Sequence, residues 1–208
     1  MRDAHKKEDT RQRLIEAGAT ILHRQGYNGT GIQEVLAACG VPKGSFYHFF
    51  KSKEDFVLAV VDHYATRMGK RVLELFSDVT LSPLARLSLF FDQMIERVND
   101  VDNPFSSCGC PIGNLVQEMA PLNAAFRHRL DEVLDGLERA MATVLRQAQA
   151  VGEIGPRHDA DELARFIVAS WHGAILRMKA AGGPEPLVRA RAFLLGMLNA
   201  SATGRHKT

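Results

Sequence analysis

"VPKGSFYHFF", residues 41–50, is the stretch of the chain that decides the fold. It places a lysine, a glycine, a serine, a tyrosine and a histidine among three phenylalanines. A helix made only for burial would carry fewer polar residues, and a fully solvated helix would carry fewer aromatic ones. The pattern therefore indicates a short helix that is anchored to a core on one side and faces a large polar partner on the other.

The residues before this stretch predict two more helices. Residues 9–25 place apolar side chains on one helical face, and Gly26 follows the end of that helix. The segment IQEVLAAC begins after Thr30, a candidate cap with a glutamine three residues on, which is the spacing of a capping box. Gly40 then supplies a tight turn. Two helices joined in this way form a helix-turn-helix, whose second helix lies in the major groove of DNA.

The beginning of the helix within residues 41–50 carries side chains suited to DNA. Lys43 can read guanine acceptors and Ser45 can bond a base or a phosphate, while Gly44 lets the backbone come close to the duplex. A hydroxyl or a ring N–H one turn further on can reach a phosphate, and the free N–H groups at a helix start suit an anion. His48 is equally compatible with a solvated surface position. The residues predicted to face DNA are Thr30, Lys43, Gly44, Ser45, Tyr47, His48 and Lys53.

The segment TRQRLIEAGATILHRQGYNGTGIQEVLAACGVPKGSFYHFFKSKEDFVLAVV, residues 10–61, resembles the DNA-binding domain of the TetR/AcrR family of transcriptional regulators. The shared pattern, GY..T.I..V....GV.KG..Y.FF.SKE, has no gap, and the one departure is KGSFY where KGTLY is commoner. The resemblance implies an all-helical dimer with three N-terminal helices for DNA and a variable C-terminal ligand domain. It also implies a repressor that a small molecule releases from its operator, and position by position it assigns DNA contact to the same seven residues.

The rest of the chain predicts helices only, because it contains no alternating β-branched runs and no hairpin signals. The expected helices cover residues 52–76, 82–98, 111–120, 122–150, 159–180 and 185–200, with a polar loop, NDVDNPFSSCGCP, before the third of these. We therefore expect an all-α fold. We place a DNA-binding helix-turn-helix domain at residues 1–53 and a ligand-binding and dimerisation domain at residues 54–208.

The distribution of charge and the number of cysteines indicate the kind of partner and the cellular location of the protein. Residues 1–53 hold 9 Lys and Arg against 5 Asp and Glu, whereas the remaining residues hold 17 against 19. A basic head on a slightly acidic body predicts a local anionic partner, either nucleic acid or an anionic membrane. The chain has no apolar run long enough to predict a membrane span and no signal-peptide pattern. Because three cysteines make no disulfide framework, we expect a reducing, cytoplasmic location.

The middle helices carry enough apolar surface to line a pocket for a small effector, with Asn114, Gln117 and His172 as candidate polar groups. The block CGCPIGNLVQEMA resembles one in a family branch that includes regulators of electrophile and acrylate detoxification genes. The predicted pocket or sensor residues are Phe90, Phe91, Met94, Cys108, Cys110, Leu115, Met119, Phe126 and Trp171.

Cys108 and Cys110 allow two interpretations. Cys110 directly precedes Pro111 at a helix start, where the helix dipole and free N–H groups favour a thiolate. We hypothesise that one of the two thiols reacts with an electrophile or oxidant, or borders the pocket of a reactive ligand. The alternative is that both are inert loop residues.

The last two expected helices carry the apolar side chains that a dimer seam needs, and Gly173 and Gly196 would permit close approach of two helices. Trp171 is compatible with either the core or this seam. The residues predicted for dimerisation are Phe166, Ile175, Phe193, Leu194, Met197 and Leu198.

Other kinds of site are weakly marked. Cysteines and histidines occur at spacings too irregular for a metal site, no base or oxyanion site accompanies a cysteine nucleophile, and no cofactor is predicted. Glu118 and Asp131 are interpreted as solvated, because neither is marked as part of an acid/base pair. We therefore expect no enzyme. The alternative from another class is a helical redox or electrophile-scavenging thiol protein in which DNA binding is secondary or lost.

Overall fold

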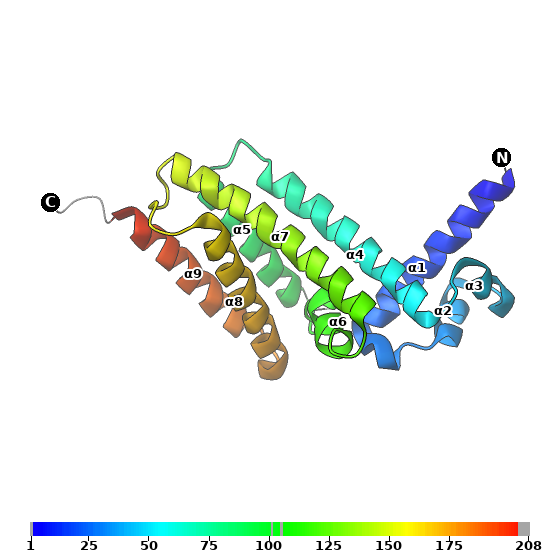
Figure 1. Ribbon diagram of the computed structural model, residues 1–208. Coiled ribbons are helices and arrows are strands. Elements are labelled where there is room, and N and C mark those ends of the chain that lie inside the picture. The colour runs from blue at the N-terminus through cyan, green and yellow to red at the C-terminus, as the bar shows by residue number, and fades with distance from the viewer. Residues whose placement is uncertain (1, 101, 105, 204–208) are drawn as a thin grey trace. The chain divides into compact units, whose positions relative to one another are not determined.

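The computed structural model describes residues 2–100, 102–104 and 106–203, and within these ranges the chain forms nine α-helices and no strand (Figure 1). Every helix expected from the sequence is present, so the prediction of an all-α fold is confirmed. The first helix begins several residues earlier than expected. The helices are α1 (Arg2–Gly29), α2 (Ile32–Cys39), α3 (Lys43–Phe49), α4 (Lys53–Phe76), α5 (Pro83–Asn99), α6 (Pro111–Met119), α7 (Ala124–Ala150), α8 (Ala160–Ala181) and α9 (Glu185–Thr203).

Side chains cap α4 and α5 where the sequence predicts that these helices begin. Ser52 Oγ accepts a hydrogen bond from the Asp55 N–H at 3.1 Å at the start of α4. At the start of α5, Ser82 Oγ accepts the Ala85 N–H, and Pro83 occupies the first turn, where a missing N–H costs nothing. These caps satisfy N–H groups that have no partner inside the helix.

Two glycines shape the N-terminal helices. Gly40 ends α2 in the left-handed conformation, at φ 63°, and its N–H bonds the Ala37 carbonyl. Gly26 lies inside α1 but is not helical, with φ 72° and ψ −175°, so residues 27–29 form a separate turn. The helix end expected at Gly26 is therefore a break within a longer element.

Thr30 does not cap α2, which corrects the expectation from the capping-box spacing. The cap position is Gly31, and no side chain bonds there. Thr30 is only 2% exposed, and its hydroxyl donates a 2.7 Å hydrogen bond to the Gly26 carbonyl. The hydroxyl that the capping-box spacing assigned to the start of α2 is therefore bonded at the break in α1 instead.

The chain packs as two compact units. The first comprises the chain up to Arg67 together with Cys110–Glu132, and the second comprises Met68–Gly109 together with the chain from Val133 onward. The division by packing therefore differs from the division by function expected at residue 53, because α6 and the first turns of α7 belong with the N-terminal helices.

The core of the first unit is built around three phenylalanine rings. The ring centroids of Phe46, Phe50 and Phe56 lie 5.0–5.4 Å apart, and all three side chains are buried. Gly18 on α1 makes room for them, since a Cβ there would lie 2.2 Å from Phe56 Cζ. Aromatic rings contribute large buried areas, so this cluster anchors α3 to α1 and α4.

The core of the second unit lies among the last turns of α4 and helices α5, α7, α8 and α9. The Phe91 and Trp171 rings are 4.7 Å apart, and Trp171 is 4% exposed. Arg86 is buried beside this core, and its guanidinium donates to the carbonyls of Phe76 and Leu81 and to the Gln147 side chain. Among the described residues, no helix is long and apolar enough to cross a membrane.

Candidate DNA interface and effector region

Helix α3 buries one face and leaves the other to solvent. Phe46 is fully buried, whereas Tyr47 is 59% exposed and Lys43 and His48 are also exposed. A Cβ added to Gly44 would meet no atom within 4 Å, so the surface beside it is open to a close partner. The helix thus presents lysine, glycine, tyrosine and histidine together, with Ser45 half-buried beside them.

The other two predicted DNA-facing residues are held by neighbours within the chain. Thr30 donates its hydroxyl to the Gly26 carbonyl and its N–H to the Tyr27 carbonyl, so neither donor is directed to a partner outside the chain. Lys53 is half-buried at the start of α4, and its ammonium lies 4.4 Å from the centre of the Tyr27 ring. A cation over an aromatic face is attracted by the ring and is fixed in position.

Tyr27 is itself strongly constrained. Its hydroxyl donates a 3.0 Å hydrogen bond to Glu54, and its ring packs edge-on against Phe126 with centroids 5.7 Å apart. Burial, followed by the Glu54 hydrogen bond and the charges of Glu54 and Glu118, raises the pKa of Tyr27 to about 12. Tyr27 is therefore neutral at physiological pH and acts as a fixed hydrogen-bond donor.

Two arginines of α1 support the helix-turn-helix. Arg13 Nη2 donates a 2.5 Å hydrogen bond to the carbonyl of Cys39, directly before the Gly40 turn. The Arg11 guanidinium lies 5.4 Å from the centre of the Phe50 ring at the end of α3. Cys39 Sγ bonds the Val35 carbonyl, as expected of a structural cysteine.

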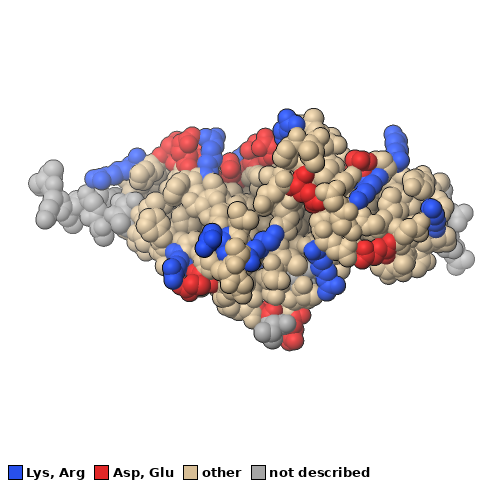
Figure 2. All heavy atoms as spheres, turned by 90° about the horizontal axis from the view of Figure 1, so that it is seen from below, with Lys and Arg blue, Asp and Glu red and all other residues tan. Residues whose placement is uncertain are grey.

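Basic and acidic side chains are interspersed on the face of the molecule that Figure 2 presents. No single sign dominates that face. That face therefore offers no broad basic surface to an anionic partner.

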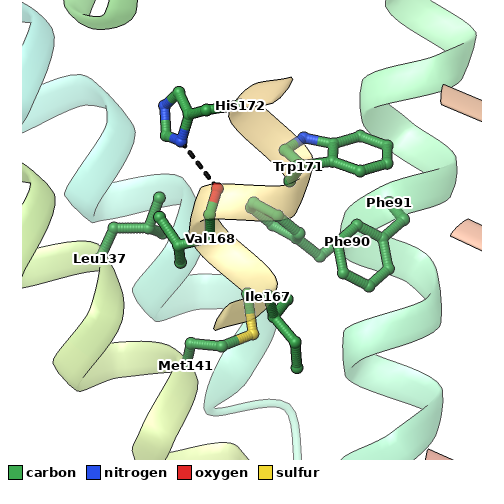
Figure 3. A pocket seen from close by; sticks show the side chains of 8 residues that line it. All are labelled: Phe90, Phe91, Leu137, Met141, Ile167, Val168, Trp171 and His172. Carbon is green, nitrogen blue, oxygen red and sulfur yellow. Dashed lines mark hydrogen bonds between the residues drawn. The ribbon is translucent and has the colours of Figure 1, made fainter. Parts of the chain in front are cut away.

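The second unit encloses a small cavity, with a volume of about 10 Å³. Its lining is apolar apart from His172, whose Nδ1 bonds the Val168 carbonyl at 2.9 Å (Figure 3). This volume suits about one water molecule, whereas pockets for small molecules have volumes of about 300–1,000 Å³. The lining residues are Phe90, Phe91, Leu137, Met141, Ile167, Val168, Trp171 and His172.

The structure divides the predicted effector residues between the two units. Phe90, Phe91 and Trp171 line the cavity, and Met94 packs against the same core. The other apolar members, Leu115, Met119 and Phe126, are buried in the first unit, on α6 and the first turns of α7. The sequence did not single out the lining residues of α7, Leu137 and Met141. Regularly spaced apolar residues predict which face of a helix is buried, but they do not show where the packing on that face leaves a cavity.

The two loop cysteines differ in their surroundings. Cys110 is the cap residue of α6, and its Sγ accepts the Gly113 N–H at 3.5 Å, with Pro111 in the first turn. Cys108 is half-buried in the preceding loop. Between them Gly109 is left-handed, at φ 75°, and a Cβ there would lie 3.1 Å from the side chain of Lys179. Cys110 thus has the helix-start position that the sequence predicts.

Glu118 is not a solvated residue, which corrects the sequence-based interpretation. Its carboxylate accepts the backbone N–H groups of Tyr27 and Asn28 at 2.6 and 2.7 Å. No local signal marked this contact, because the two segments are 90 and 91 residues apart in the sequence. Asp131, interpreted in the same way, is exposed on α7 as expected.

The residues predicted for dimerisation separate into two groups. Phe166 and Phe193 are 51% and 70% exposed, and each lies on an outer face of its helix. Leu194 and Leu198 are 2% and 1% exposed and belong to the core of the second unit, so they have almost no surface left for the predicted dimer seam. Being four residues apart on α9, they share the face that meets their own chain.

Ile175 and Met197 are half-buried against that same core. Leu176 and Val188, which the sequence analysis did not select, are 51% and 43% exposed. Together with the two phenylalanines they leave apolar side chains in solvent on both α8 and α9.

Two family models match the chain. The model for "Bacterial regulatory proteins, tetR family" matches residues 14–60, and the model for "Tetracyclin repressor-like, C-terminal domain" matches residues 83–194. The first match covers the helix-turn-helix, and the second runs from α5 into α9.

Named relatives agree with these matches. The chain is 44% identical over 176 residues to the transcriptional regulator AcuR of Cereibacter sphaeroides, covering 85% of this chain and 79% of that protein. It is 34% identical over 177 residues to the transcriptional repressor DhaR of a Mycobacterium species, covering 85% and 86%. The crystal structure of the reduced form of Escherichia coli NemR superposes with a TM-score of 0.83 at 27% identity, covering 89% of this chain and 95% of that one. These relatives are transcriptional regulators and not enzymes.

Proposed function

The chain belongs to the TetR family of transcriptional regulators, and we propose that it is a cytoplasmic repressor released from its operator by a small molecule or a reactive electrophile. Regulators of this family bind DNA operators and act as dimers. The observation that carries the proposal is the exposed beginning of α3, where Lys43, Gly44 and Tyr47 are held outward by the buried Phe46. The repressor assignment also agrees with the name of the DhaR relative.

Residues 1–53 carry the DNA contacts in this proposal, and residues 54–208 carry the effector and dimer functions. Lys43 and Ser45 read base edges, while Tyr47, His48 and Lys53 bind phosphates and so fix the register on the duplex. Thr30 contributes indirectly in this proposal, by holding the start of α2 in place, because its hydroxyl and its N–H are both bonded within the chain.

Selection of bound duplexes from a random pool tests the DNA function directly. A dimer with one helix-turn-helix per subunit predicts a two-fold symmetric site with half-sites about 34–36 Å apart. Recovery of an unsymmetric site, or no enrichment at any salt concentration, would contradict the proposal.

The dimer seam in this proposal runs along the exposed apolar faces of α8 and α9. Phe166 and Phe193 are its anchors, since large side chains left in solvent within a folded chain are suited to a partner surface. Gly173 and Gly196 support it, because a Cβ at either position would meet nothing within 4 Å inside the chain. Packing within the chain gives no reason for these helix glycines, which cost about 1 kcal/mol each relative to alanine.

An effector would enter the second unit at the cavity between α5, α7 and α8. Three observations support this place: the apolar lining, the single imidazole of His172, and a volume that shows imperfect packing. Because about 10 Å³ is too small for a drug-sized ligand, binding has to move the lining helices apart. An effector that binds there would therefore stabilise a conformation in which the cavity is open.

The cysteines provide a second route to release, by covalent modification. Cys110 accepts the Gly113 N–H at the start of α6, a position that favours negative charge on sulfur. The structure of one relative, Escherichia coli NemR, is described as that of its reduced form. Replacing both Cys108 and Cys110 by serine separates the two routes. If the double variant leaves DNA as readily as the wild type on exposure to N-ethylmaleimide, the cysteines take no part.

A further inference from the structure

The carboxylate of Glu118 reaches from α6 to the backbone directly after the break in α1. Its two oxygens accept the N–H groups of Tyr27 at 2.6 Å and of Asn28 at 2.7 Å. Gly26 interrupts the helical hydrogen-bond ladder there, so the N–H groups that follow it need acceptors, as at a helix start. Glu118 supplies both acceptors as a charged cap that comes from another helix.

Gly26 fits this contact in two independent ways. Its φ of 72° is a conformation that L side chains rarely adopt. A Cβ at this position would also lie 2.6 Å from Glu118 Oε2, which is closer than real Cβ contacts come. The backbone therefore turns outward at Gly26 and admits the carboxylate at the same residue.

The segment held by Glu118 in turn holds parts of the DNA interface. The Tyr27 ring supports the Lys53 ammonium at 4.4 Å, and its hydroxyl bonds Glu54 in the first turn of α4. The Tyr27 carbonyl accepts the Thr30 N–H at 3.3 Å, directly before α2. Displacing Tyr27 would therefore move a candidate phosphate contact and the entry to the helix-turn-helix together.

We propose that Glu118 is a positioning residue for DNA binding, whose carboxylate fixes the segment after Gly26 and, through Tyr27, the Lys53 ammonium and the start of α2. This rests on the proposed operator-binding function. Helix α6 begins at the Cys110 cap and ends just after Glu118. A displacement of this helix would therefore move the Glu118 carboxylate, and with it the segment that positions the DNA-facing residues. Glu118 itself contacts no DNA in this account.

The test compares Glu118→Gln with Asp131→Asn in the full-length chain. Both changes replace a carboxylate by an amide in the first unit, but Asp131 is exposed on α7 and lies outside the contact. The glutamine side chain keeps one acceptor and presents a donor to the other N–H group. We expect about tenfold weaker operator binding, which corresponds to about 1.4 kcal/mol, because one charge-assisted hydrogen bond is lost. The salt slope of binding should fall by about one unit or less, because Lys53 is the candidate phosphate contact that Glu118 positions through Tyr27.

Backbone hydrogen exchange, measured without DNA, gives a readout that does not depend on the operator. Amides of residues 27 and 28 should exchange faster in Glu118→Gln than in the wild type, and at the wild-type rate in Asp131→Asn. Gly26→Ala should reproduce both the faster exchange and the weaker binding, because its Cβ displaces the same carboxylate. This second variant keeps the test decisive if Glu118→Gln folds poorly.

The outcomes separate failure of this inference from failure of the proposed function. If the wild type binds its operator and Glu118→Gln binds equally well despite faster exchange, the contact is merely structural and the proposal is overturned. Unchanged exchange at residues 27 and 28 overturns the contact itself. If the wild type enriches no duplex, the DNA function fails first, and Glu118 retains at most a structural role.

Discussion

Helix α3 holds its polar residues in solvent, whereas the cavity between α5, α7 and α8 is closed to about 10 Å³. The first region is ready for a partner without rearrangement, since Phe46 already anchors the helix. The second has to open before it can admit more than a water molecule. In the proposed function, DNA binding therefore belongs to the conformation described, and an effector stabilises another one.

The largest expected effect comes from removing the anchor of α3. Phe46→Ala should lower the free energy of unfolding by about 3–5 kcal/mol, because a fully buried ring leaves a cavity behind. It should abolish operator binding as α3 loses its support. Tyr47→Ala is the matched change, on an exposed ring of the same helix, and should weaken DNA binding with little loss of stability. Chemical denaturation and operator titration of both variants measure this. Equal losses of stability would show that α3 is not anchored as described.

A substitution in the cavity lining tests whether the cavity is closed in the conformation described. Met141→Ala should enlarge the cavity and cost about 2–5 kcal/mol of stability, because Met141 is 1% exposed among the lining residues. Benzene, as a small apolar probe, should raise the melting temperature of this variant more than that of the wild type. Operator binding below the melting transition should persist. A wild type stabilised equally by benzene would contradict the closed cavity.

The dimer seam is expected to respond less strongly. Phe193→Glu should raise the dimer dissociation constant by about 30-fold or more, as expected for an interface anchor contributing about 2 kcal/mol. Leu73→Glu is the control, since Leu73 is 68% exposed on α4, outside the proposed seam. Sedimentation at a series of concentrations measures both. A dimer weakened equally by the two changes would move the seam away from α9.

What the sequence predicts well is local in the chain. The caps at Ser52 and Ser82 and the left-handed turn at Gly40 each follow from residues within one turn of each other. The anchoring role of Phe46 follows from the helical period. These features account for the ends of α2, α4 and α5 and for the way α3 is anchored.

What the sequence does not predict depends on contacts between distant segments. The Thr30 hydroxyl donates a hydrogen bond to the Gly26 carbonyl, at the break in α1. The Glu118 carboxylate accepts a hydrogen bond from a backbone N–H about 90 residues away in the sequence. The helical spacing of apolar residues does not distinguish core positions such as Leu194 and Leu198 from positions in a dimer seam. Only their packing against the rest of their own chain identifies them as core residues. Packing defects such as the cavity have no sequence signature, because their volume depends on how side chains from three helices meet.

The most direct measurement for the account is the operator affinity of Lys43→Ala, determined against a panel of single-base variants over a range of salt concentrations. Lys43 is exposed at the start of α3, where a base contact contributes about 1–3 kcal/mol of discrimination. The account predicts weaker binding to the selected operator together with lost discrimination at one base pair in each half-site. Unchanged affinity and unchanged discrimination across the panel would contradict the assignment of α3 as the recognition helix.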